Sequence, residues 1–129
     1  MPLGGGVLAS ALVATALTLA PNASASAATP TFVQAASATP PTPQSVVSVA
    51  VNQAETAGNS NIVAIGWNDT AASIASITDS AGNTYAAAIA TFRGDGISQA
   101  VYYASGVAGG GDTVTVTFDR AASYVDLRE

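Results

Sequence analysis

Aromatic side chains are the groups of this chain best suited to contact a ligand, because an exposed flat ring can stack against a sugar ring. The available rings are those of Trp67, Tyr85, Phe92, Tyr102 and Tyr103. Tyr102 and Tyr103 are neighbours, and neighbouring residues of a strand point to opposite faces of its sheet, so one of the two is expected to face outward. Trp67 ends an apolar run, which favours core packing over ligand contact. The candidate ligand contacts are Tyr102, Tyr103, Trp67 and Tyr85.

Four aspartates are predicted to lie at strand ends or in loops, where carboxylates and backbone carbonyls can together hold calcium. Three of them, Asp69, Asp95 and Asp112, are candidate metal ligands. The fourth, Asp79, opens the segment DSAGN at 79–83, which lacks the alternating oxygen ligands of a calcium loop and is instead typical of a turn. Calcium is therefore the one cofactor that the sequence leaves open, and no other cofactor is predicted.

The composition of the chain excludes several classes of function. There is no cysteine and no histidine, which excludes thiol chemistry, the usual structural zinc sites, and Ser/His or Cys/His nucleophiles. A glycosidase would need two carboxylates facing each other across a cleft, and about 100 mature residues leave little room for one. A hydrolase built on aspartates is therefore the least favoured alternative, no catalytic residues are predicted, and we expect that the protein is not an enzyme. A net charge of -5 with three arginines and no lysine argues against nucleic acid as a partner.

The N-terminal segment predicts export. Residues 7–20 form an apolar run of 14 residues, followed by Pro21 and by the small-residue pattern ASASA at 23–27. The run is shorter than the roughly 20 residues of a membrane-spanning helix, and the small residues suit cleavage after Ala25 or Ala27. Residues 1–6 lack the lysine or arginine that usually begins a signal peptide, so an uncleaved anchor or a buried helix stays open as the alternative. We expect a signal peptide at 1–27, a secreted or cell-surface protein, and no membrane span after cleavage.

Residues 28–44 are rich in threonine, alanine and proline. Pro40, Pro41 and Pro43 disfavour a helix and favour extended backbone. This segment is predicted to be a linker or a first edge strand, with 32–34 as a short strand within it. The domain itself is expected at 45–129.

Alternating apolar and polar residues predict strands throughout this domain. The clearest alternation is at 113–119, where Val114, Val116 and Phe118 share one face and threonines the other. The segment 61–67 is apolar on both faces, which predicts a central strand that is covered on both sides. Further strands are predicted at 46–51, 73–78, 84–90, 99–104 and 124–128, with the turn at 79–83 closing a hairpin between two of them. The sequence therefore predicts an all-β fold, an antiparallel β-sandwich of the jelly-roll or immunoglobulin-like kind.

Four motifs carry a resemblance to a known kind of module: GWNDT at 66–70, TDSAGNTY at 78–85, QAVYYA at 99–104 and TVTVTF at 113–118. In this order and spacing, over residues 31–128, they resemble a jelly-roll-type β-sandwich accessory module of bacterial secreted and cell-surface proteins. The resemblance implies an extracellular, non-catalytic domain, and it transfers no ligand residues to this chain. Similar modules continue past the segment equivalent to 124–128 with further strands, so the domain is expected to be incomplete at its C-terminal end.

The leading expectation is a secreted, non-catalytic binding module for carbohydrate or another extracellular polymer. The alternative is a structural spacer domain within a larger secreted enzyme or adhesin. The expected partners are accordingly an extracellular polysaccharide or neighbouring domains of the full-length protein. An exposed pair of aromatic rings would favour the first expectation, and a rim without aromatic residues or clustered acidic residues would favour the second.

Overall fold

The computed structural model describes Met1 and residues 28–129, and the segment Phe32–Glu129 forms one compact unit. Within the described residues there is no helix, and none therefore that could cross a membrane. The strands are β1 (Ser37–Ala38), β2 (Gln44–Ala50), β3 (Ser60–Trp67), β4 (Ile74–Asp79), β5 (Ala86–Arg93), β6 (Ser98–Ser105), β7 (Thr113–Ala122) and β8 (Asp126–Arg128). The predicted all-β fold is confirmed. The predicted signal peptide and its cleavage sites lie outside the described residues.

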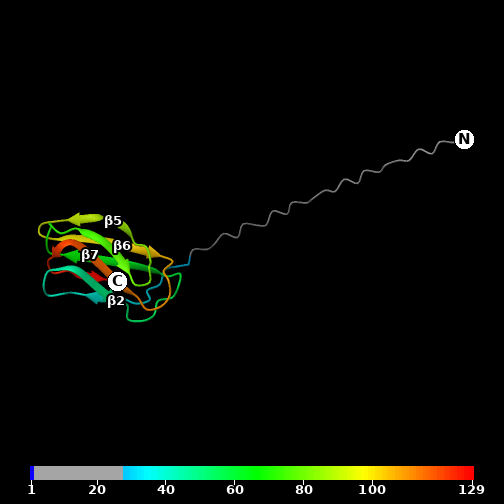
Figure 1. The fold of residues 1–129 in the computed structure, drawn as a ribbon, viewed down its shortest axis with the longest axis horizontal. Coiled ribbons are helices and arrows are strands. Elements are labelled where there is room, and N and C mark those ends of the chain that lie inside the picture. The colour runs from blue at the N-terminus through cyan, green and yellow to red at the C-terminus, as the bar shows by residue number, and fades with distance from the viewer. Residues whose placement is uncertain (2–27) are drawn as a thin grey trace. The chain divides into compact units, whose positions relative to one another are not determined.

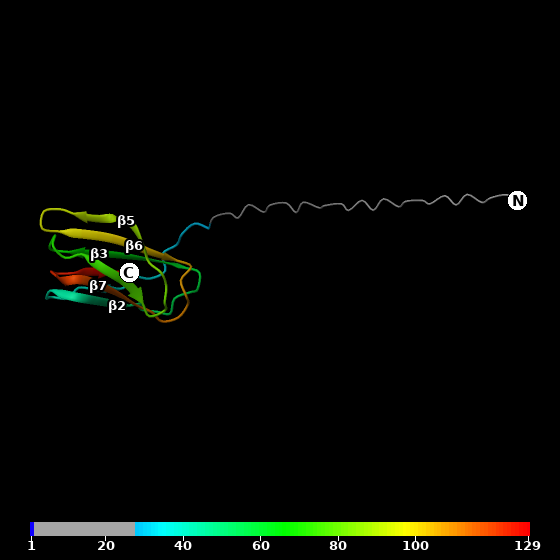
Figure 2. The same cartoon turned by 45° about the horizontal axis from the view of Figure 1, so that its top comes forward.

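The strands form two antiparallel sheets. One has five strands in the order β1-β8-β3-β6-β5, and the other has three in the order β2-β7-β4. Figures 1 and 2 show the sheets as two layers, with β5 and β6 on one side and β2 and β7 on the other. The pairing is nested, because β1 pairs with β8, β2 with β7 and β3 with β6. Strands that are distant in the chain therefore lie side by side.

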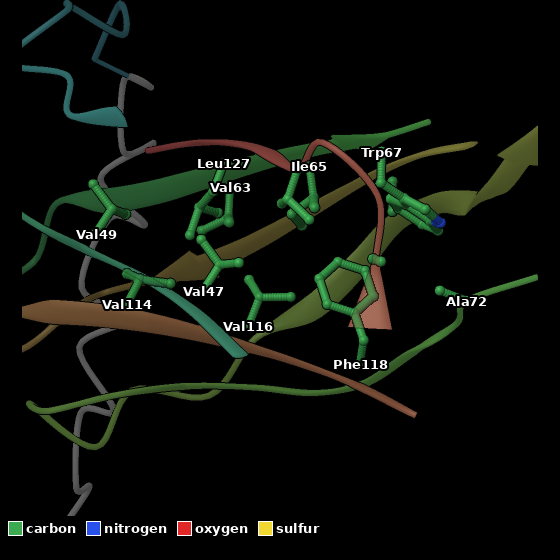
Figure 3. Close-up of a cluster of buried hydrophobic side chains, with 13 residues drawn as sticks. Val47, Val49, Val63, Ile65, Trp67, Ala72, Val114, Val116, Phe118 and Leu127 are labelled. Carbon is green, nitrogen blue, oxygen red and sulfur yellow. The ribbon is translucent and has the colours of Figure 1, made fainter. Parts of the chain in front are cut away.

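The core fills the space between the two sheets. Along β7 the predicted alternation is confirmed, because Val114, Val116 and Phe118 are buried while the threonines between them are partly exposed. Figure 3 shows these side chains meeting Ile65, Trp67 and others that project from the five-stranded sheet. The rings of Trp67 and Phe118 meet edge to face with centroids 5.3 Å apart. Such a geometry stabilises an aromatic pair in addition to the contribution of the apolar area that the two rings bury.

The prediction that the turn at 79–83 closes a hairpin is wrong. β4 pairs only with β7, and β5 pairs only with β6, so the turn carries the chain from one sheet to the other. The turn chemistry itself is present: Gly82 has a φ of +78°, and Asp79 Oδ1 accepts the Asn83 N–H at 2.8 Å. The turn is bound to the start of β7, because the Ser80 N–H donates to the Thr113 carbonyl and to Asp112 Oδ1. These contacts favour β7 over β5 as the partner of β4.

The prediction that 61–67 is covered on both sides is also wrong. In β3 the residues Val63, Ile65 and Trp67 are buried, but Ile62 on the opposite face is 55% exposed. The reason is architectural, since the three-stranded sheet covers one face of the five-stranded sheet and no element of residues 28–129 covers the other. The apolar residues on the open face of β3 are therefore surface residues.

The segment before β2 differs from the prediction in one respect. No strand forms at 32–34, where Phe32 is 83% exposed, and the short strand β1 lies further along and pairs with β8 at the sheet edge. The Gln34 side chain replaces a strand pairing, because its amide accepts the Gln53 N–H at 2.9 Å and donates to the Gln53 carbonyl at 3.0 Å. A side chain has thus satisfied backbone groups that a strand would otherwise bond.

Candidate binding surface

The uncovered side of the five-stranded sheet, called the outer face below, is the surface of most interest. Residues paired across antiparallel strands share a face, so the register of the sheet arranges the outer face in rows. The rows run Phe92, Gln99, Gly66, Asp126; then Ile89, Val101, Ala64, Arg128; then Ala86, Tyr103, Ile62. The larger apolar residues therefore lie toward β5 and β6, together with Ile62 of β3, whereas Gly66, Ala64 and the charged residues of β8 lie toward the other side of the face.

Large apolar side chains are unusually exposed on this face. Phe92 and Ile89 of β5 are 58% and 59% exposed, and Ile62 and Tyr103 are exposed in the third row. Phe92 and Ile89 lie on the edge strand β5, and every residue of this strand is exposed. A contiguous exposed apolar patch of this kind is characteristic of an interaction surface.

An open groove of about 330 Å³ lies at the β8 side of this face. Gly66 forms its floor, and a Cβ placed there would meet no atom within 4 Å, so the missing side chain leaves real space. Ile97, Gln99, Tyr124 and Asp126 are among its lining residues. The groove thus combines an aromatic ring, an aliphatic group, an amide and a carboxylate around a glycine.

Tyr124 is held in an unusual backbone conformation. Its φ of +46° makes it the one non-glycine residue in the left-handed region among the described residues, and its side chain remains 62% exposed. The loop before it is fixed to the end of β3, because the Asn68 N–H donates to the Ser123 carbonyl at 2.7 Å and the Ser123 N–H donates to Asp69 Oδ2 at 2.9 Å. A bulky residue at positive φ is strained, and such strain concentrates at functional sites.

The charges at the groove compensate each other. Asp126 and Arg128 lie two residues apart on the same face of β8, and the guanidinium donates to both carboxylate oxygens at 2.9 to 3.1 Å. This two-pronged geometry is the strong form of an arginine–carboxylate pair. The pair offers hydrogen-bonding groups to a ligand without giving the groove a net charge.

The four aromatic candidates are not brought together. Tyr103 points to the outer face, whereas Tyr102 is half-buried and packs against the core. Trp67 is 1% exposed, so its ring belongs to the core and is not available to a ligand. The Tyr85 hydroxyl donates to Asp79 Oδ2 at 2.9 Å and accepts from Asn61 Nδ2 at 3.3 Å. Burial, followed by the hydrogen bond to Asp79 and its charge, raises the pKa of Tyr85.

The three metal candidates lie apart and have different environments. Asp69 Oδ1 accepts the Ala71 and Ala72 N–H groups at 2.9 and 2.7 Å, so its carboxylate closes its own turn. Asp95 is exposed in the β5–β6 turn, and Asp112 is buried before β7. The described residues contain no group of three or more His, Cys, Asp or Glu side chains arranged to hold a metal ion.

Burial alone would raise the pKa of Asp69, but the N–H groups of Ala72, Ser123 and Ala71 outweigh it and lower the pKa below its usual value. The carboxylate is thus stabilised in its charged form by backbone donors. This environment is that of a structural turn residue.

Sequence reasoning missed Tyr124 and the groove. The strand predicted at 124–128 included Tyr124, but the observed strand begins only at Asp126, and Val125 and Leu127 are buried. No residue type in this segment signals a left-handed backbone, since glycine and asparagine are the usual markers. Gly66 was the available signal, because a glycine inside a strand often marks close approach to another molecule.

Comparisons with protein-family models, with curated protein sequences and with solved structures found no match.

Proposed function

We propose that the protein is a secreted, non-catalytic β-sandwich module that binds an uncharged carbohydrate polymer on its outer face. The observation that carries this proposal is the groove at Gly66, flanked by the exposed ring of Tyr124 on an otherwise open sheet face. A sugar ring has an apolar face and a rim of hydroxyl groups, and this groove offers partners for both.

The lining groups favour carbohydrate over other extracellular ligands. Tyr124 and Ile97 supply apolar contact, while Gln99 and the paired Asp126 and Arg128 supply donors and acceptors for hydroxyl groups. Since the two charges compensate each other, the groove favours a neutral polymer over an acidic or basic one. The exposed Phe92 and Ile89 of β5 and Tyr103 of β6 extend the contact surface beyond a single sugar unit.

The fold is consistent with such a module. The nested pairing of β1 with β8, β2 with β7 and β3 with β6 supports the jelly-roll form over the immunoglobulin-like form. Together with the predicted signal peptide, it supports the extracellular location that the resemblance implies. The fold alone does not specify a ligand, so the proposal rests on the groove.

Binding assays on groove variants test the proposal. The wild-type domain and three variants are run through native gels containing cellulose derivatives, xylan, β-glucan or soluble chitin, with alginate as a charged comparison. Gly66→Val fills the floor of the groove, and Tyr124→Asn removes the ring while keeping a residue that tolerates positive φ. Ala75→Val, on the exposed side of β4 in the other sheet, is the matched control.

We expect at least one neutral polymer to retard the wild-type domain in the gel. In both groove variants we expect the affinity for that polymer to be about tenfold weaker or more. The control is expected to bind like the wild type. Binding that survives both groove substitutions would place the ligand elsewhere on the domain. Absence of binding to every neutral polymer would favour the spacer alternative.

A further inference from the structure

Two glutamates meet at the end of the sandwich where β3 begins. Glu55 lies between β2 and β3, and its backbone exchanges two hydrogen bonds with Gly110, at 2.7 and 3.0 Å. Glu129 follows β8, and its backbone exchanges two hydrogen bonds with Ala36, both at 2.9 Å. Each glutamate is thus fixed at its backbone, and the two carboxyl groups lie within hydrogen-bond reach of each other.

Both carboxyl groups have an unsatisfied buried oxygen. Glu55 Oε2 and Glu129 Oε2 are each buried and have no hydrogen-bond partner. Two ionised carboxylates are acceptors only, so they cannot bond each other and would repel. A single proton between them removes both defects, because a protonated carboxyl group donates to the carboxylate beside it.

The surroundings favour uptake of a proton. The other titratable groups that interact with Glu129 are Asp112, which is 5% exposed and also has a buried oxygen without a partner, Asp79, and the Tyr85 hydroxyl group. No cation compensates them, since the chain has no lysine or histidine, Arg120 and Arg128 pair elsewhere, and Arg93 donates to Thr70, Ala72 and Ser98 near the other end of β3.

The pKa of Glu129 is raised, as this acidic environment predicts. Burial first, and then the charges of Glu55 and Asp112, raise the pKa of Glu129 from its usual 4.5 to about 7. The Asp79 charge acts in the same direction. A carboxyl group in this environment keeps its proton in mildly acidic medium.

We propose that Glu55 and Glu129 share one proton and that this carboxyl–carboxylate hydrogen bond holds the end of β8 against the β2–β3 connection. Folding takes up this proton from solvent, and the pair then carries one negative charge instead of two. Because the folded pKa lies above the unfolded one, the stabilisation is fully present below about pH 4.5 and is lost as the pH rises through about 7. The domain is thereby adapted to mildly acidic surroundings.

Thermal melts between pH 5.5 and 8.5 test the proposal. The chain has no histidine and no cysteine, so few ordinary side chains titrate in this window. Glu129→Gln and Glu55→Gln each replace one carboxyl group by an amide, which donates to the remaining carboxylate without a proton. Asp95→Asn removes the same charge from an exposed turn and is the matched control.

We expect the melting temperature of the wild type and of the control to fall by roughly 5 °C or more across the window. Both glutamine variants are expected to be nearly flat and to melt above the wild type at pH 8.5. Carbon-13 NMR of the Glu129 carboxyl group provides a measurement on the unaltered chain, with an expected midpoint near pH 7.

Three results would overturn the proposal. The first is a wild-type melting temperature that does not change across the window, and the second is a glutamine variant with the wild-type slope. The third is a rise in wild-type stability on adding 5 mM calcium chloride, roughly a concentration that fills weak extracellular calcium sites, if it is absent from both glutamine variants. That result would show that a cation, rather than a proton, occupies the pair.

Discussion

Replacing Asp69 by alanine is expected to destabilise the domain strongly, because this carboxylate accepts three backbone N–H donors. Two of them, from Ala71 and Ala72, close the turn after β3, and the third, from Ser123, ties the β7–β8 loop to that turn. Hydrogen bonds to a charged acceptor contribute more than neutral ones, but this group is only partly buried, so we take about 1 kcal/mol for each. The expected loss is about 3 kcal/mol, a large part of the stability of a domain of this size.

Asp69→Asn provides a graded comparison. Its amide oxygen can still accept from Ala71 and Ala72, but its NH2 group would then face the Ser123 N–H, and two donors cannot bond each other. We expect this variant to lose about 1 to 2 kcal/mol, less than alanine does.

Urea denaturation at pH 7, with EDTA or with calcium chloride, measures these losses. The pKa of Asp69 is lowered from its usual 3.8, so its contribution is present above pH 3.8 and is lost as the pH falls through the folded value. The difference in the free energy of unfolding between wild type and Asp69→Ala should therefore be constant near neutral pH and become smaller at acidic pH. An unchanged unfolding midpoint in Asp69→Ala would refute the reasoning. A loss of stability that is seen only when calcium chloride is present would instead make Asp69 a metal ligand.

Two further predictions concern the turn between the sheets and the N-terminal segment. Gly82→Val should lower the free energy of unfolding by about 1 kcal/mol or more, because a β-branched residue is strained at a φ of +78°. Gly111→Val is the control, since that site is equally open but has no positive φ, and it should lower the free energy of unfolding by less in the same denaturant melts. Equal losses of stability in the two variants would contradict the conformational explanation. Mass spectrometry of the exported protein should find a mature chain cleaved after Ala25 or Ala27, and a chain that keeps residues 7–20 would favour the anchor.

The sequence predicts the strands of this domain well because each strand is a local pattern. The alternation around Val116 places one face in the core wherever the strand lies, and Val125 and Leu127 follow the same rule. Which strands pair with each other does not follow from such local patterns. The turn at 79–83 has hairpin chemistry, but the contacts of Ser80 with Thr113 and Asp112 commit β4 to β7, and such long-range contacts leave no local pattern.

The candidate surface was only partly predictable for the same reason. An outward tyrosine at 102 or 103 follows from strand geometry, and Tyr103 has that orientation. Whether the apolar outer face of β3 is covered depends on whether a further element packs outside the two sheets, which no single segment encodes. The pairing of Glu55 with Glu129 joins residues from opposite ends of the domain, and it depends on the completed fold.

The nested pairing of the strands also has a consequence for how the chain folds. The β5–β6 pair closes a short turn, whereas pairing β1 with β8 closes a loop that contains nearly the whole domain. Loop-closure entropy grows with the length of the loop, so the outer pair is entropically least costly after the inner pairs have shortened the effective loop. A topology dominated by such distant contacts belongs to the slow-folding class. Assembly from the β5–β6 hairpin outward would make the β1–β8 edge the last part to form and the first to open.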